Sequence, residues 1–131
     1  MAFRFFNRFK TILVVEDDAS LRRAVTEKLA QESFKVLEAG DGEAGLSIAL
    51  REHPDLLLLD LMLPKMDGMT MLERLREDAW GSDAAVVVIT NLGETDERRQ
   101  RAEQLKVLEY IDKSRYTLEE LLQKVERALR G

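Results

Sequence analysis

The sequence contains no cysteine, which excludes disulfide bonds and thiolate metal sites. It also contains only two prolines, one tryptophan and one histidine. No stretch approaches the roughly 18 apolar residues of a membrane span. No stretch combines the apolar core and small-residue cleavage site of a signal peptide. These absences predict a soluble, cytoplasmic protein.

The composition indicates one acidic domain with a distinct N-terminal arm. A chain of 131 residues is long enough for one domain and buries roughly two-thirds of its surface on folding. The formal net charge of −5 argues weakly against nucleic acid as a direct partner. Residues 1–10, MAFRFFNRFK, contain four of the five phenylalanines and no acidic residue. We therefore expect an aromatic and basic arm over residues 1–10 and one domain over residues 11–131.

The arm has two interpretations. Aromatic residues interleaved with arginine and lysine are suited to contact with a membrane surface or a partner protein. In the other interpretation, Phe9, with or without Phe6, packs beside the first strand while the other arm residues are disordered. The sequence leaves both open.

Apolar runs alternate with segments of helical periodicity along the chain. The helical segments place apolar residues three or four positions apart, as with Leu21, Val25 and Leu29. A capping box formed by Thr117 and Glu120 marks the start of the last helix. The runs that predict strands are Ile12–Val15, Phe34–Ala39, Leu56–Leu59, Ala85–Ile89 and Leu108–Ile111.

The predicted strands are apolar throughout rather than alternating, which is typical of a parallel sheet covered on both faces. Five strand–helix units joined by right-handed crossovers form a doubly wound α/β fold. The fourth predicted helix, ETDERRQRAEQL (94–105), offers only Ala102 and Leu105 to the core. Because it gains little from burial, we expect it to be among the least stable elements. It is either an ordinary solvated helix or an element that shifts between two states.

Polar side chains directly follow four of the five predicted strands. Ligands bind to open parallel sheets beyond the carboxyl ends of the strands, near the point where the strand order reverses. We therefore expect these side chains to lie around one crevice. They are Glu16, Asp17 and Asp18 after the first strand, Asp60 after the third, Thr90 after the fourth, and Asp112 and Lys113 after the fifth.

Taken singly, each of these residues has an ordinary explanation. An aspartate after a strand usually caps a helix or a turn, and paired acids often act with a helix dipole. Four such strand ends together are harder to explain in that way. Clustered carboxylates require a compensating cation, and oxygen ligands favour Mg²⁺, with Mn²⁺ as the alternative. A metal-bound aspartate beside a lysine and a hydroxyl is also suited to phosphoryl transfer.

Four motifs resemble the receiver domain of bacterial response regulators, the phosphoacceptor half of two-component signalling. The motifs are ILVVEDD, LLLLDLMLPKMDG, VVVIT and YIDK, and they occur in the family's order over about residues 11–130. The resemblance implies a flavodoxin-like fold. Its five-stranded parallel sheet has the order 2-1-3-4-5 and is accompanied by five helices.

The resemblance also implies roles for the residues at the strand ends. Asp60 corresponds to the phosphorylated residue, and Thr90 and Lys113 correspond to the groups that contact the phosphoryl group. Tyr110 corresponds to an aromatic switch residue that turns inward when Thr90 moves toward the phosphate. Asp18 is an extra acid that we interpret as a helix cap. The implied metal ligands are Asp17, Glu16 acting through water, Asp60, and the backbone carbonyl of Met62.

Three departures from the family pattern affect the site. Ser114 follows Lys113 where the family usually has a proline after a cis peptide bond. Because a cis bond before serine costs about 3–4 kcal/mol, we expect this loop to differ. Asn91 replaces a usually small residue, where it crowds the phosphoryl group or donates to it. Met62 and Leu92 are apolar at positions that tune dephosphorylation, and we expect them to lengthen the phosphorylated state.

The implied function is that of a phosphoacceptor signalling protein rather than a conventional enzyme. A sensor histidine kinase or a histidine phosphotransfer protein donates to Asp60, and the chain catalyses its own phosphorylation and slow dephosphorylation. His53, in REHPD, is interpreted as a loop residue and a poor phosphodonor. Because nothing follows the last helix, we expect a stand-alone receiver. It would signal to an unidentified protein through its fourth helix, fifth strand and fifth helix. The alternative is the excised receiver of a longer regulator.

Two other functions remain open. A Mg²⁺-dependent phosphohydrolase resembling the haloacid dehalogenase family has a second aspartate two residues after the nucleophile, where this chain has Met62. A pseudo-receiver that never accepts phosphate is disfavoured by the intact set of acids, threonine and lysine. Ser114 and Asn91 nevertheless leave that alternative open.

Overall fold

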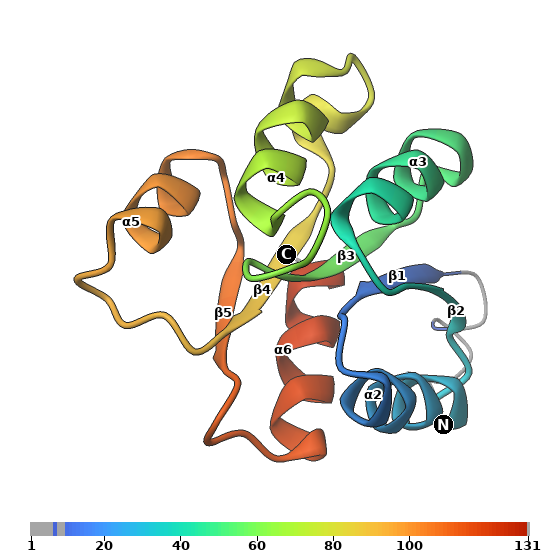
Figure 1. Cartoon of the computed structure of the whole chain (residues 1–131). Helices are drawn as coiled ribbons and strands as arrows, with labels where there is room; N and C mark the ends of the chain where they lie inside the picture. The colour runs from blue at the N-terminus through green and yellow to red at the C-terminus, as the bar shows by residue number, and fades with distance from the viewer. Residues whose placement is uncertain (1–6, 8–9, 131) are drawn as a thin grey trace.

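The computed structural model describes Asn7 and residues 10–130. The described residues contain one parallel sheet with the strand order β2-β1-β3-β4-β5, which confirms the predicted order (Figure 1). Each strand begins and ends within one residue of the predicted position. The strands are β1 (Thr11–Val15), β2 (Lys35–Ala39), β3 (Leu56–Asp60), β4 (Val86–Thr90) and β5 (Glu109–Asp112).

Helices cover both faces of this sheet. Two of them, α2 (Ala19–Gln31) and α6 (Leu118–Arg130), lie on one face. On the other face lie α3 (Gly42–Glu52), α4 (Gly68–Glu77) and α5 (Glu97–Gln104), with a short 3-10 helix, η1 (Gly81–Asp83), after α4. Successive residues of each buried strand point to opposite faces, so β3 contributes to both halves of the core. This explains why the central strands are apolar throughout.

Aspartates cap four of the helices and fix where the chain leaves the sheet. Asp18 accepts hydrogen bonds from the backbone of Ser20 and Leu21, which confirms its interpretation as a cap. Thr117 accepts a hydrogen bond from the backbone N–H of Glu120, as the predicted capping box requires. The other three aspartate caps are Asp41 at α3, Asp67 at α4 and Asp96 at α5.

The fourth predicted helix is α5, and it is shorter than the sequence indicated. It begins at Glu97 rather than at residue 94, because Asp96 is the N-cap and accepts from the backbone N–H of Arg98. Its only fully buried residue is Ala102, while Leu105 is half-buried. The prediction that this helix contributes little to the core is therefore confirmed.

Two described residues fall within the predicted arm, and both contact the domain. The buried side chain of Asn7 donates hydrogen bonds to the carbonyl of Glu32 at 2.9 Å and to the carboxylate of Glu126 at 3.2 Å. The carbonyl of Lys10 accepts from the backbone N–H of Lys35 at 3.1 Å. Phe6 and Phe9, on which the two interpretations of the arm depend, lie outside the described residues.

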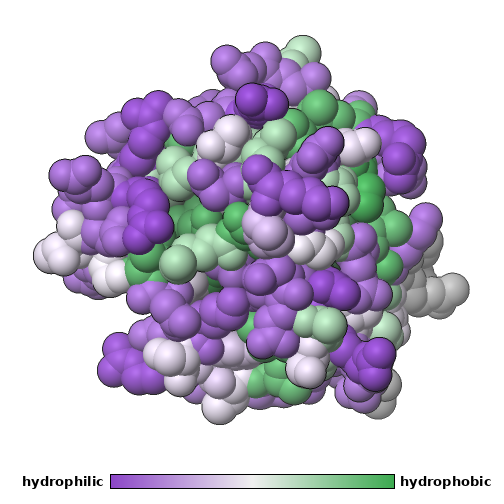
Figure 2. Space-filling view, viewed as in Figure 1, coloured by the Kyte–Doolittle hydropathy of each residue, from purple (hydrophilic) through white to green (hydrophobic). Residues whose placement is uncertain are grey.

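The visible surface is largely hydrophilic, with apolar residues exposed in separate patches (Figure 2). Trp80 stacks on His53 with ring centroids 4.4 Å apart. His53 lies outside helices and strands, as expected. None of the described helices has the length and apolar content that a membrane crossing requires.

Candidate functional site

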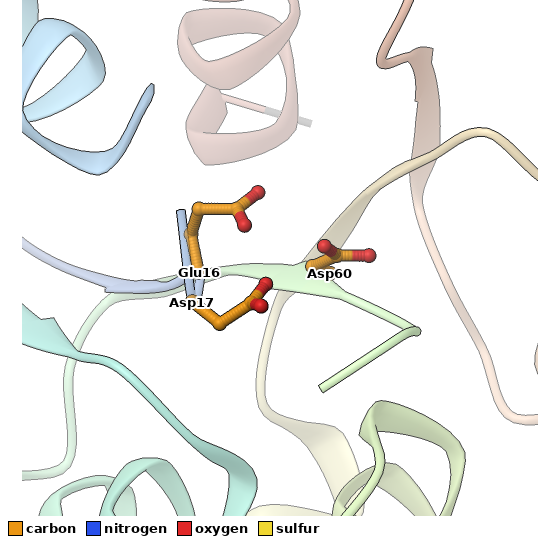
Figure 3. A group of neighbouring side chains, drawn as sticks. All are labelled: Glu16, Asp17 and Asp60. Carbon is orange, nitrogen blue, oxygen red and sulfur yellow. The ribbon is translucent and has the colours of Figure 1, made fainter. Parts of the chain in front are cut away.

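Three carboxylates meet beyond the ends of β1 and β3. These strands are neighbours in register, with Val15 opposite Leu59, so the residues that follow leave the sheet at the same edge. One carboxylate oxygen from each of Glu16, Asp17 and Asp60 lies within 4.8 Å of the others (Figure 3). Two of these side chains are buried and Asp17 is exposed, so the group opens to solvent on one side. Such an all-oxygen donor set fits a hard divalent cation such as Mg²⁺.

Lys113 supplies the positive charge between the two buried acids. Its ammonium lies 2.7 Å from Asp60 Oδ2 and 2.9 Å from Glu16 Oε1. Burial lowers the pKa of Lys113, but the hydrogen bonds and charges of Asp60 and Glu16 outweigh it and raise that pKa. The backbone N–H of Lys113 donates to the carbonyl of Thr90 at 3.0 Å, which fixes the start of this loop on β4.

The pKa of Glu16 is shifted by its burial. Burial raises its pKa, and the nearby charge of Asp60 adds to this effect. Hydrogen bonds from the backbone of Asp18 and from Lys113 lower the pKa but do not restore its ordinary value. The neutral form of Glu16 is therefore favoured relative to a carboxyl group in water.

Backbone hydrogen bonds hold the remaining polar groups. Asp60 Oδ1 accepts from the N–H of Met62 at 3.0 Å, and the hydroxyl of Thr90 accepts from the N–H of Leu92 at 3.1 Å. Thr90 is as buried as Asp60, at 2% exposure. Met62 and Leu92, the two apolar positions expected to tune dephosphorylation, differ in exposure. The side chain of Met62 is 51% exposed, while Leu92 is buried in the core.

A close approach of α4 fixes the backbone of Asp60. A Cβ on Gly68, the first residue of α4, would lie 2.1 Å from the carbonyl oxygen of Asp60 and 2.5 Å from Leu61 Cα. Only glycine permits this contact without a shift of the helix or the loop. The motif pair Asp67–Gly68 therefore both begins the helix and positions Asp60.

Asp112 does not join the carboxylate group, although it also ends a strand. Its Oδ1 accepts from the N–H and the hydroxyl of Ser114, and its Oδ2 pairs with Arg115 at 3.1 Å. The expectation that Asp112 contributes to the crevice is therefore wrong, because its carboxylate caps the following turn. No described peptide bond is cis, so the bond between Lys113 and Ser114 is trans.

Tyr110, a residue of β5, is half-buried, and its side chain contacts α5. Its hydroxyl donates to the carbonyl of Arg99 at 3.4 Å, and the guanidinium of Arg99 lies 4.5 Å from the ring centroid. Burial and the charge of Glu103 raise the pKa of Tyr110 to about 12, against an opposing effect of Arg99. The phenol is therefore neutral at physiological pH.

Two arginines near the site were not predicted from the sequence. Arg22 of α2 donates to the carbonyl of Glu16 at 2.7 Å, and Arg99 contacts Tyr110 as described above. Both lie on helices, where the direction of a polar side chain depends on how the helix packs. The only available signal for Arg22 was its place one turn after the cap Asp18.

Comparison with known proteins identifies the family. Residues 12–126 match the family model of the response regulator receiver domain. The chain belongs to this family. Its motifs, strand order and acidic group had implied the same assignment. The family is a phosphoacceptor signalling family that binds Mg²⁺ in an acidic pocket, and Glu16, Asp17 and Asp60 form an acidic cluster in this chain.

The curated relatives are longer proteins. The probable transcriptional regulator ycf27 of Porphyridium aerugineum is 42% identical over 87 residues, which are 66% of this chain and 35% of that protein. The DNA-binding dual master transcriptional regulator RpaA of Synechocystis sp. is 36% identical over 119 residues, which are 91% of this chain and 48% of that protein. The receiver domain thus spans between a third and a half of these relatives.

Solved structures of similar chains share the fold. A response regulator receiver domain protein from Methanospirillum hungatei has a TM-score of 0.84 at 26% identity, covering 92% of this chain and 94% of that one. The receiver domain of a sensor histidine kinase from Pseudomonas aeruginosa has a TM-score of 0.83 at 23% identity. That match covers 93% of this chain and 98% of that one, and the solved structure has a magnesium ion coordinated in its active site cleft.

Proposed function

We propose that the receiver domain accepts a phosphoryl group onto Asp60 in a Mg²⁺-dependent reaction. The donor is a phosphohistidine of a sensor histidine kinase or a histidine phosphotransfer protein. The observation that carries this proposal is the convergence of Glu16, Asp17 and Asp60 beside Lys113 at one edge of the sheet. Asp60 is the proposed nucleophile because it contacts Lys113 and corresponds to the phosphorylated residue of the family.

The side chains of Glu16, Asp17 and Asp60, with the carbonyl of Met62, are the proposed ligands of the ion. When bound, Mg²⁺ supplies positive charge that stabilises the transferring phosphoryl group. The acids themselves position the ion on the open side of the site, next to Asp60. By the resemblance to the family, Asp17 is proposed to bind the ion directly and Glu16 to act through water.

Lys113 and Thr90 complete the phosphoryl site. The ammonium of Lys113 already contacts Asp60. It is therefore close enough to form an ion pair with the oxygens of a phosphoryl group on Asp60. The oxygen of Thr90 accepts from Leu92, so its O–H proton remains available for donation to the phosphoryl group. Movement of Thr90 toward the phosphate then biases Tyr110 and the face formed by α5, β5 and α6.

The proposed readout is a contact between this face and a protein partner in the cytoplasm. The weak burial of α5 favours it as the moving element, because few core contacts must be broken when it shifts. The net charge of −5 favours a protein over DNA as the partner of the receiver domain itself. The two curated relatives are named transcriptional regulators, and signalling to a domain elsewhere in a longer regulator is the alternative output.

Incubation with acetyl phosphate and Mg²⁺, followed by intact mass spectrometry, tests the proposal. We expect the mass to increase by one phosphoryl group in the native chain and to remain unchanged for Asp60→Asn. Lys113→Met is expected to lower the extent of modification while leaving the nucleophile in place. Lack of modification of the native chain contradicts the proposal, and steady turnover of a small phosphate ester would favour a phosphohydrolase instead.

A further inference from the structure

Arg99 of α5 connects Thr90 and Tyr110, the two proposed switch residues, through hydrogen bonds and a ring contact. Its Nη1 donates to the carbonyl of Leu92 at 3.1 Å, and the N–H of Leu92 donates to the hydroxyl of Thr90 at 3.1 Å. Its guanidinium lies over the ring of Tyr110, and its carbonyl accepts the Tyr110 hydroxyl. Thr90 and Tyr110 are therefore connected through one side chain on a third element.

One nitrogen of the Arg99 guanidinium lacks a hydrogen-bond partner within the part of the chain that the structure describes. Its Nε is buried and has no acceptor among the described residues. The neighbouring arginines differ, because Arg98 pairs with the cap Asp96 and Arg101 pairs with Glu73. The unpaired Nε offsets part of the stabilisation that the contacts with Leu92 and Tyr110 provide. Arg99 therefore holds the N-terminal half of α5 with a modest net free energy.

The opposite end of α5 is attached more firmly. The guanidinium of Arg76, on α4, donates to the carbonyls of Leu105 at 2.8 Å and Lys106 at 3.3 Å. The same side chain donates to the carbonyls of Gly81 and Ala84, so α4, η1 and the end of α5 are held together. A shift of α5 is therefore easier at its N-terminal half, where Arg99 lies, than at its C-terminal end.

We propose that Arg99 is a positioning residue that holds the unphosphorylated conformation by joining Leu92 to Tyr110. This inference rests on the proposed function. When Thr90 moves toward the phosphoryl group, Leu92 moves with it and its carbonyl leaves Arg99. The guanidinium then releases the ring of Tyr110, and the N-terminal half of α5 is free to shift. By linkage, removal of the Arg99 side chain favours the phosphorylated conformation before any phosphate is present.

The test compares Arg99→Met with Arg101→Met. The second variant removes the same type of side chain from the same helix, but Arg101 contacts Glu73 and not the switch residues. The affinity of each chain for beryllofluoride with Mg²⁺, a phosphoryl mimic, is measured by isothermal titration calorimetry. We expect Arg99→Met to bind beryllofluoride about two- to thirtyfold more tightly than the native chain. Arg101→Met should bind like the native chain.

Two further measurements separate a positioning role from a purely structural one. The aromatic NMR signals of Tyr110 in the unliganded chain should change in Arg99→Met and remain unchanged in Arg101→Met. Arg99→Lys retains a charge but only one nitrogen, so it should give a smaller increase in affinity in the same direction. If thermal unfolding shows that Arg99→Met does not fold, Arg99→Lys provides the same comparison.

If the native chain binds beryllofluoride but the Arg99 variants bind it equally well or more weakly, only the proposed role of Arg99 is overturned. The same is true of an equal gain in Arg101→Met, which would assign the effect to loss of charge on α5. If the native chain neither binds beryllofluoride nor accepts phosphate, the proposed function fails and the role of Arg99 fails with it.

Discussion

At the residue scale, the polar groups of the site are held in place by the backbone before any ligand binds. Asp60, Thr90 and Glu16 each accept a hydrogen bond from a backbone N–H two residues further along the chain. Such prior orientation lowers the cost of arranging the groups during phosphoryl transfer. We therefore expect the side chains around these groups to affect how easily water reaches Asp60 rather than how the groups are oriented.

Met62 is the exposed side chain next to Asp60, and we expect it to hinder the water that hydrolyses the acyl phosphate. Met62→Asn should shorten the lifetime of phosphorylated Asp60 on the order of tenfold, because an amide is able to orient that water. The decay is followed by intact mass spectrometry after removal of the donor. Leu50→Asn, at another exposed apolar residue outside the site, is the control. An unchanged or longer lifetime in Met62→Asn contradicts this role.

The prediction for Met62 does not extend to Leu92, because Leu92 is buried. The sequence placed Met62 and Leu92 together as apolar residues that tune dephosphorylation, but Leu92 is buried in the core. A polar residue at position 92 would therefore act on stability as well as on hydrolysis. The sequence does not distinguish the two positions, because burial depends on how α5 packs.

At the element scale, the contact between α4 and the end of β3 is the tightest constraint on Asp60. Gly68→Ala places a Cβ 2.1 Å from the Asp60 carbonyl oxygen, so either α4 or the loop must move. We expect phosphorylation by acetyl phosphate to slow by about tenfold or more, and the free energy of unfolding to fall by about 1–3 kcal/mol.

Gly93→Ala is the matched control for this substitution. A Cβ at Gly93 meets no atom within 4 Å and requires no unusual backbone angle, so the chain should fold and react normally. Rates are measured from the appearance of the phosphorylated mass, and stabilities from urea unfolding. If Gly68→Ala reacts at the native rate, the close approach of α4 does not position Asp60.

The cap of α5 gives a pH-dependent prediction. The hydrogen bonds from the side chain and backbone of Arg98 lower the pKa of Asp96 below its ordinary value of 3.8. The contribution of Asp96 to helix stability is therefore present above that value and is lost as the pH falls through the lowered pKa. Asp96→Ala should reduce the helical Cα chemical shifts of residues 97–104 at pH 7, and the difference from the native chain should disappear in strong acid.

Glu94→Ala is the control for the cap, because Glu94 is a neighbouring exposed acid that is not the N-cap. It should leave the helical shifts at pH 7 unchanged. A difference between native and Asp96→Ala that persists at low pH would show that the carboxylate charge is not what stabilises the helix.

The strands and the acids were predictable from the sequence, but the helix-borne contacts were not. Buried parallel strands are apolar on both faces, so their runs are visible, and the residues that follow them must share one edge of the sheet. Asp60 and Glu16 were found in this way. Arg99 and Arg22 act from helix faces, and their contacts depend on side-chain directions that periodicity does not specify. Asp112 was wrongly assigned to the crevice. The sequence does not show that its carboxylate binds Ser114 and Arg115 within the local turn.

At the scale of the whole molecule, the fold brings together acids that burial and mutual repulsion disfavour. A divalent ion that binds this group therefore stabilises the folded chain by linkage. At 100 times its dissociation constant, Mg²⁺ should raise the free energy of unfolding by about 2.7 kcal/mol, measured by urea unfolding. Asp17→Asn removes the exposed carboxylate and should lose most of this gain.

Sodium chloride at equal ionic strength is the control for charge screening in this experiment. It should give only a small part of the effect of Mg²⁺. Equal stabilisation of the native chain and Asp17→Asn by Mg²⁺ would show that the ion acts elsewhere on the surface.

The central claim is that Asp60 is phosphorylated where the acids hold the ion, and mapping of the modified residue tests it most directly. The chain is treated with acetyl phosphate, the acyl phosphate is reduced with borohydride to homoserine, and peptides are sequenced by mass spectrometry. We predict homoserine at position 60 alone, with Mg²⁺ present and not after its chelation. Homoserine at another aspartate position, or equal yield without a divalent ion, would contradict the account.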